Sequence, residues 1–262
     1  MTTEHIQTTS AERTRGGVDI LPEPREDIYF ENLDNSAAEK LAEAGVIVLT
    51  NFLDRGTTDD VRLSARNRIL VASPMLLGRR ILSDLTPDSI DLPRIFRRKA
   101  LTQRIHSRLP FKTGVEMVLH GVEGINDQLY TFPVLSNIYG DEPYSLTDII
   151  INKTPSENWF PEHQDAPSIR GFGFAIQTED TLWHVMAQKT NPESRDFIFS
   201  TAPGDLVVLR QRVREWHDEA VFAPSEVGER YYIDGSVVHR GMNLSERARY
   251  NISLFSVEKG HL

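Results

Sequence analysis

The sequence predicts a mainly β protein with N-terminal and inserted helices, and two observations predict it. From about residue 111 the chain consists of short β-branched or aromatic runs between turn residues, which is typical of a sandwich or barrel. No Walker loop or dinucleotide fingerprint accompanies them. The predicted strands are TGVEMVLHGV, QLYTFPVLSNIY, LTDIIINK, RGFGFAIQT, TLWHVMAQ, DFIFSTA, DLVVLRQRV, RYYIDGSVVH and RYNISLFSV.

The N-terminal part precedes these strands. Residues 1–25 are polar and rich in Thr and Arg, and we expect them to be disordered. NSAAEKLAEAG predicts a helix with Asn35 or Ser36 as its N-cap and Gly45 as its stop signal, and VIVLTNFLD predicts a buried strand. Residues 57–108 have helical character, interrupted by prolines.

Composition limits the function classes. The chain has 262 residues, a net charge of −9, 39% hydrophobic residues and no Cys, so a metal site must be built from His and carboxylates. The acidic balance argues against a nucleic-acid binder. No apolar run reaches the roughly 20 residues of a membrane span, and the N-terminus lacks a signal-peptide core. We expect a cytoplasmic protein that binds a small molecule, of unassigned oligomeric state.

One segment carries the opposite charge. Residues 94–108 hold six Arg or Lys residues and no acid. On a helix, Arg97, Arg104 and Arg108 would share one face. A solvated helix face and a dock for an anionic substrate both explain this pattern.

A metal site is suggested by HQD at residues 163–165. Side chains at i and i+2 of an extended strand point the same way, so His163 and Asp165 can face one point. A second His from a distant strand would complete the facial triad of non-haem iron oxygenases. His239 follows a predicted strand, and Arg249 lies ten residues later on the next strand. A buried guanidinium suits the distal carboxylate of a dicarboxylate.

This motif order resembles the Fe(II)/2-oxoglutarate-dependent dioxygenase superfamily. DGSVVHRGMNLSERAR is similar to the phytanoyl-CoA hydroxylase-like branch, in which an Asn-x-Ser turn precedes the 2-oxoglutarate Arg. INKTPSENWFPEHQD resembles a strand of the alkylation-repair dioxygenases, where an Asn eleven residues before the first His contacts 2-oxoglutarate. Asn152 has that place, although Thr154 replaces the usual Tyr.

The resemblance implies a double-stranded β-helix (a cupin-like jelly roll), with residues 26–262 as one domain and the jelly-roll core at about 111–258. It implies Fe(II) on His163, Asp165 and His239, with 2-oxoglutarate held by Arg249 and Asn152. With O₂, the implied reaction releases succinate and CO₂ and hydroxylates or desaturates an unactivated C–H bond of an amino acid or natural-product intermediate. Asp165 favours these outcomes over halogenation, because the family's halogenases have Gly or Ala there.

A second distal pair remains open. His217 lies twelve residues after Asp205, and Arg230 lies thirteen after His217, a spacing that prolyl-hydroxylase-like members use. We prefer His239 and Arg249, because the family places its Arg on the last strand. The rival functions are nucleic-acid demethylation, a non-catalytic jelly roll and a cupin that uses another metal without a co-substrate.

Other positions have two interpretations each. Arg170 is either a substrate-carboxylate ligand or a surface residue, and residues 177–196 include a predicted mobile lid. His184 either reaches the pocket or, as we expect, lies in the core or on the surface, and His120 is expected on a framework strand. Trp159 and Phe160 either wall the site or belong to the core.

Overall fold

The computed structural model describes residues 22–66, 101–106, 115–146, 148–160, 163, 165, 169–186, 195–211, 221–225, 228–232 and 237–257. The helices are α1 (Asn35–Ala44), α4 (Val115–Leu129) and α5 (Pro133–Tyr139), and residues 55–66 are also helical. The strands are β1 (Tyr29–Phe30), β2 (Val46–Leu49), β3 (Leu101–His106), β4 (Asp148–Thr154), β5 (Ile169–Gln177), β6 (Thr181–Val185), β7 (Phe197–Thr201), β8 (Leu206–Arg210), β9 (Val221–Ser225), β10 (Gly228–Tyr232), β11 (His239–Asn243) and β12 (Arg249–Val257).

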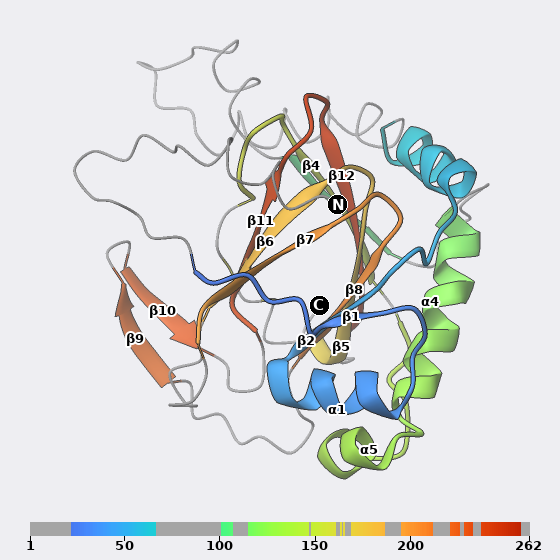
Figure 1. Ribbon diagram of the computed structural model, residues 1–262, viewed down its shortest axis with the longest axis vertical. Coiled ribbons are helices and arrows are strands. Elements are labelled where there is room, and N and C mark those ends of the chain that lie inside the picture. The colour runs from blue at the N-terminus through green and yellow to red at the C-terminus, as the bar shows by residue number, and fades with distance from the viewer. Residues whose placement is uncertain are drawn as a thin grey trace.

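Two sheets form the body of the protein (Figure 1). The larger has the order β1-β2-β8-β5-β12-β4-β3, and the smaller has the order β11-β6-β7. Backbone bridges at Trp159 and His163 add the segment before β5 to the free side of β11. From β4 to β12 the chain therefore passes repeatedly between the sheets, with the hairpin β9–β10 inserted before β11. This strand order is that of a double-stranded β-helix, and the predicted fold class is confirmed.

Apolar side chains pack on both faces of the larger sheet. Its outer face packs against the helices, with Leu41, Val122 and Leu135 in one cluster with Phe172 and Ile252. In Figure 1 the helices lie along the right and lower edges of the sheets, and the hairpin β9–β10 lies at the left. The inner face faces the smaller sheet, and a second cluster packs part of the space between them. Hydrophobic burial thus holds the helices outside and leaves the interior between the sheets for a site.

The predicted N-terminal helix is confirmed as α1, with one difference at its start. The N-cap is Asp34, whose carboxylate accepts from the Ala37 N–H, and not Asn35 or Ser36. Gly45 ends the helix as predicted, with a left-handed φ of 77° and an N–H that donates to Leu41. A Cβ at this position would also lie 2.7 Å from the Val237 side chain. The buried strand β2 begins at the next residue.

Two predicted strands are wrong. TGVEMVLHGV and QLYTFPVLSNIY contribute to helices α4 and α5. Three fully buried residues recur at helical spacing: Val118, Val122 and Leu129. The ten-residue segment TGVEMVLHGV is too short to reveal this period. Pro133 occupies the first turn of α5, where a missing N–H costs nothing. His120 consequently lies on a helix, where it is exposed, and not on a strand.

The predicted helical region at 57–108 is correct at its start and wrong near its end. Residues 55–66 are helical, but residues 101–106 form β3 and pair with β4. Arg104 therefore shares no helix face with Arg97 and Arg108, which lie outside the described residues. Of residues 1–25, predicted to be disordered, residues 1–21 also lie outside them, whereas Pro24 and Arg25 pair with Ile198 of β7. In the part of the chain that the structure describes, no helix is long and apolar enough to cross a membrane.

Candidate active site

A cavity of about 200 Å³ lies between the two sheets, and all five predicted site residues line it. Apolar and aromatic side chains form most of its wall, and the polar groups gather at the triad and around Arg249. The residues that line it are Ile150, Asn152, Phe160, His163, Asp165, Ile169, Phe174, Ala175, Trp183, Leu209, His239, Gly241, Arg249, Asn251, Ser253 and Phe255.

Backbone pairing brings the two distant histidines together. His163 and His239 exchange both backbone hydrogen bonds at 3.0 Å, as directly opposed antiparallel residues do. Their rings lie 4.5 Å apart, centre to centre, and Nε2 of His163 lies 3.8 Å from Oδ1 of Asp165. Ligand atoms of His163, Asp165 and His239 all lie within 4.8 Å of one another.

His239 has the protonation state of a metal ligand. Its Nδ1 lies 3.0 Å from the Val237 carbonyl, which can only accept, so Nδ1 carries the proton and Nε2 keeps its lone pair. Burial, together with the nearby His163, lowers the pKa of His239 to about 4. The ring is therefore neutral near pH 7, the form that binds a metal.

Asp165 is buried beside the histidines and already has one partner. The side-chain amide of Gln211 donates to its Oδ2. Oδ1 is the oxygen that faces His163. Two imidazoles and one carboxylate, with no thiolate, suit a divalent first-row metal. In a facial set the three ligand atoms lie on one side of the ion, roughly 3 Å apart for bonds of about 2.1 Å, so binding would draw the three side chains together.

Arg249 lies at the start of β12 with an incompletely satisfied guanidinium. Its side chain is only 2% exposed, yet it has no acidic partner among the described residues. Nη2 donates to Thr154 Oγ1 at 3.0 Å and to the Gly241 carbonyl at 3.4 Å, whereas Nε and Nη1 find no acceptor in the described structure. Burial lowers the pKa of Arg249 to about 9, which leaves it charged near neutral pH.

The surroundings of Arg249 make room for an anion. A Cβ on Gly241 would lie 2.9 Å from Nη1 of Arg249, so only glycine leaves that side open. Asn152 lies on β4, lines the same cavity, and has a buried side-chain oxygen with no partner in the described part. Because the amide can rotate by 180°, this position can also present N–H donors.

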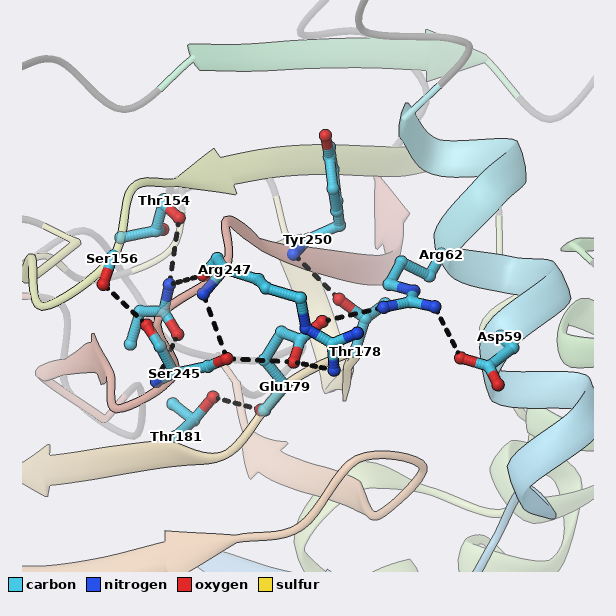
Figure 2. A network of polar contacts seen from close by, with 11 residues as sticks. Asp59, Arg62, Thr154, Ser156, Thr178, Glu179, Thr181, Ser245, Arg247 and Tyr250 are labelled. Atoms are coloured by element: carbon cyan, nitrogen blue, oxygen red, sulfur yellow. Dashed lines mark hydrogen bonds and ion pairs between the residues drawn. The ribbon is translucent and has the colours of Figure 1, made fainter. Parts of the chain in front are cut away.

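The strand ends beside Arg249 are fixed by a polar network around buried Glu179 (Figure 2). Glu179 accepts from Arg62 at 3.4 Å, from Arg247 at 3.1 Å and from the Ser245 hydroxyl at 3.2 Å. The predicted Asn-x-Ser turn is part of this region, since the Asn243 side chain donates to the Arg247 carbonyl and accepts from the Ser245 N–H. The network ties helix 55–66 to the turns before β6 and β12.

Several other predicted positions are placed by the structure. Phe160 lines the cavity, whereas Trp159 packs under the Arg240 guanidinium at 4.2 Å and does not line it. His184 is buried and contacts Asp196 and Arg240, in agreement with its expected role outside the cavity.

Within residues 177–196, which were predicted to include a mobile lid, residues 181–185 form the buried strand β6, and residues 187–194 lie outside the described part, so the lid stays a prediction. Arg170 is buried on β5 and does not line the cavity, so it is not the surface cation that we considered.

The alternative distal pair is not brought to the cavity by any described contact. His217 lies outside the described residues, and Arg230 is placed only as a backbone position on hairpin β9–β10. The described metal-capable group contains His239.

Sequence reasoning missed Gln211, Gly241 and the contact from Thr154 to Arg249. A signal existed for Gln211: it follows Val207 and Leu209 at a strand period of two, so a polar residue continues an inward-facing apolar row. No such signal exists for Gly241, because its role depends on a side chain from another strand.

No protein-family model matches the sequence, and no curated protein matches it. Among solved structures, a Pseudomonas putida prolyl-4-hydroxylase is similar, with 14% identity and a TM-score of 0.48 over 85% of this chain and 97% of that one. A Burkholderia pseudomallei oxidoreductase of the 2OG-Fe(II) oxygenase family has 14% identity and a TM-score of 0.44 over 88% and 95%. The epimerase SnoN from nogalamycin biosynthesis has 11% identity and a TM-score of 0.47 over 84% and 83%. Identities this low transfer no activity, and the site's own residues remain the basis for function.

Proposed function

We propose that this chain is an Fe(II)/2-oxoglutarate-dependent oxygenase that hydroxylates or desaturates a C–H bond of a small metabolite. The observation that carries the proposal is the pairing of two features in one cavity. A two-His, one-carboxylate set lies on one wall, and a buried cation lies on another, with two nitrogens that find no acceptor in the described part of the chain. An uncompensated buried charge is costly, so Arg249 calls for an anionic ligand.

The residues present fit both groups. His163, Asp165 and His239 would hold Fe(II) and leave open positions for the co-substrate and O₂. Arg249, with Asn152 nearby, would hold the distal carboxylate of 2-oxoglutarate, since charge-assisted hydrogen bonds inside a dry cavity are strong. When bound, iron and 2-oxoglutarate supply the oxidation of the C–H bond with release of succinate and CO₂.

Residues of the protein itself would position the two groups and shield them from solvent. The Val237 carbonyl fixes the His239 tautomer, and Gly241 keeps the approach to Arg249 open. Phe160, Phe174 and Trp183 wall the cavity and exclude water. The small cavity and the net charge of −9 favour a small molecule over a nucleic acid. The Asn243 turn before Arg249 supports a place in the phytanoyl-CoA hydroxylase-like branch.

The decisive experiment is an anaerobic titration of the apoprotein with Fe(II) and then with 2-oxoglutarate, followed by visible absorption. We expect a charge-transfer band that requires both components, with succinate formed on admission of air. The band should be lost in His239→Ala and kept in His217→Ala. The His217→Ala protein serves as the control for the alternative distal pair.

Other outcomes change the proposal in defined ways. Loss of the band only in His217→Ala would keep the activity and transfer the distal roles to His217 and Arg230. Metal binding without a 2-oxoglutarate-dependent band would indicate a cupin without this co-substrate. Absence of any band in the wild type would contradict the proposal.

A further inference from the structure

We infer that Gln211 is a positioning residue that restricts Asp165 to one metal-binding oxygen. The inference rests on the proposed function and deepens it. Asp165 Oδ2 accepts from the Gln211 amide, while Oδ1 faces His163 Nε2 at 3.8 Å. The two carboxylate oxygens are thus assigned different partners before any ion is present.

The backbone around Gln211 fixes the direction of its side chain. Val207 and Leu209 on β8 point into the space between the sheets, and Gln211 follows at the same period. The Gln211 N–H donates to the Gly171 carbonyl at 2.9 Å, and its own carbonyl accepts from the Tyr139 hydroxyl at 3.2 Å. Helix α5 and strand β5 therefore hold the residue from two sides, and its side chain is only 1% exposed.

Strand β5 is shaped to admit the amide. Its pairing with β12 moves from Gly173 opposite Phe255 to Arg170 opposite Ser256, so Gly171 and Phe172 form a bulge. Beside this bulge, a Cβ on Gly173 would lie 2.7 Å from Gln211 Nε2. The absence of a side chain at residue 173 is what allows Gln211 to reach Asp165.

The chemistry of the contact explains why an amide is useful there. A carboxylate can bind a metal through one oxygen or two, and a second bound oxygen would take a position that the co-substrate or O₂ needs. Gln211 occupies Oδ2 with a neutral donor. The negative charge of Asp165 therefore remains available to the metal, whereas a Lys or Arg at this place would neutralise it.

The test compares Fe(II) affinity of apoproteins under anaerobic conditions, by competition with a chromophoric chelator. Gln211→Met removes the donor at similar volume, and Gly173→Ala displaces the intact amide. We expect both to weaken Fe(II) binding on the order of 10- to 100-fold, as loss of a ligand's hydrogen-bond partner does. Gln177→Met is the matched control: this fully buried Gln on β5 donates to Asn251 at 2.8 Å and contacts no triad residue in the described structure, so its Fe(II) affinity should stay at the wild-type value.

A measurement on the unmodified protein keeps the test independent of variant folding. The infrared difference spectrum between Co(II)-loaded and apo protein, with ¹³C-labelled Asp carboxylates, reports the separation of the two carboxylate stretches. A wide separation, typical of one-oxygen binding, is expected, and folded Gln211→Met should narrow it.

The outcomes separate the two proposals. Wild-type Fe(II) affinity in folded Gln211→Met, or a two-oxygen carboxylate signature in the wild type, would overturn the role of Gln211 while the oxygenase proposal stands. If the wild type binds neither Fe(II) nor Co(II), the proposed function fails, and the role of Gln211 fails with it.

Discussion

Glu179 and Arg249 are two buried charged side chains at neighbouring strand ends, and their surroundings are opposite. Each is 2% exposed. Glu179 accepts from two guanidiniums and one hydroxyl, so its charge is fully compensated by the protein (Figure 2). Arg249 meets one hydroxyl and one carbonyl and has no acid beside it in the described structure.

We interpret the difference as that between a charge used for stability and a charge that would bind the proposed ligand. The hydrogen bonds and ion pairs of Glu179 offset the free-energy cost of its desolvation, and they join three segments of the chain. The desolvation of Arg249 is not offset within the described protein. A buried cation that points into a cavity can be compensated by an anion that arrives from solution.

The largest expected effect is that of Arg249→Met on 2-oxoglutarate binding. Removing one partner of a buried charged pair should weaken binding on the order of 10² to 10³-fold, measured by calorimetry on the Fe(II) protein. The melting temperature should stay unchanged or rise, because an uncompensated charge leaves the interior.

Arg247→Met is its control, since Arg247 is largely exposed and contacts Glu179 and not the cavity. Equal 2-oxoglutarate binding by wild type and Arg249→Met would remove the distinction between the two charges.

Glu179→Gln should act in the reverse direction, on stability and not on ligands. It removes the carboxylate beside Arg247 and leaves Arg62 with Asp59 alone, and we expect a loss of about 1–3 kcal/mol in the free energy of unfolding by urea. The partial exposure of both arginines keeps the loss below that of a fully buried pair. Fe(II) affinity of the folded variant should match the wild type, and a large drop in it would show that the network also shapes the site.

Gly241→Ala tests the space beside Arg249 without removing its charge. The new methyl group would press on Nη1 from 2.9 Å, and overpacking of this kind costs about 1–3 kcal/mol. We expect 2-oxoglutarate affinity to fall roughly tenfold.

The control is Gly124→Ala on helix α4, where nothing lies within 4 Å of an added Cβ. It should leave the affinity unchanged and raise stability by roughly 0.5–1 kcal/mol. Unchanged binding in Gly241→Ala would show that the anion approaches Arg249 from another side.

The smallest effect concerns Asp27, a surface counterpart of Glu179. Hydrogen bonds from Arg25, with a further contribution from Lys40, lower the pKa of Asp27 to about 2 from its ordinary 3.8. A lowered folded-state pKa stabilises the protein above about pH 4, and this contribution is lost as the pH falls through 2.

Because Asp27 is half exposed, Asp27→Asn should cost less than about 1 kcal/mol at pH 7. The urea midpoints of variant and wild type should converge near pH 2. A difference that persists there would mean that the ion pair is not its source.

Local patterns in the sequence determined several elements. Gly45 ends α1 because the residue after the helix adopts a left-handed backbone conformation, which glycine adopts without steric cost. His163 and Asp165 lie side by side, as the spacing of two residues in an extended segment predicts. The β-branched runs of β4, β8 and β12 identified the main sheet strands correctly. These properties depend on neighbours along the chain, which a single sequence shows.

The tertiary structure decided what depends on residues far apart. Residues 115–139 form helices that pack against β5 and β12. Their β-branched composition had predicted strands, because a sequence does not show which surface a segment packs against. The register of β11 against the segment before β5 placed His239 opposite His163.

Three features of the site likewise depend on residues from different strands. They are the contact from Gln211 to Asp165, the open space beside Gly241 and, within the described structure, the lack of an acceptor for two nitrogens of Arg249. Sequence shows which residues can carry a charge, a donor or a turn. Only the folded chain shows which of them meet a partner and which, like Arg249 in the described structure, keep donors without an acceptor.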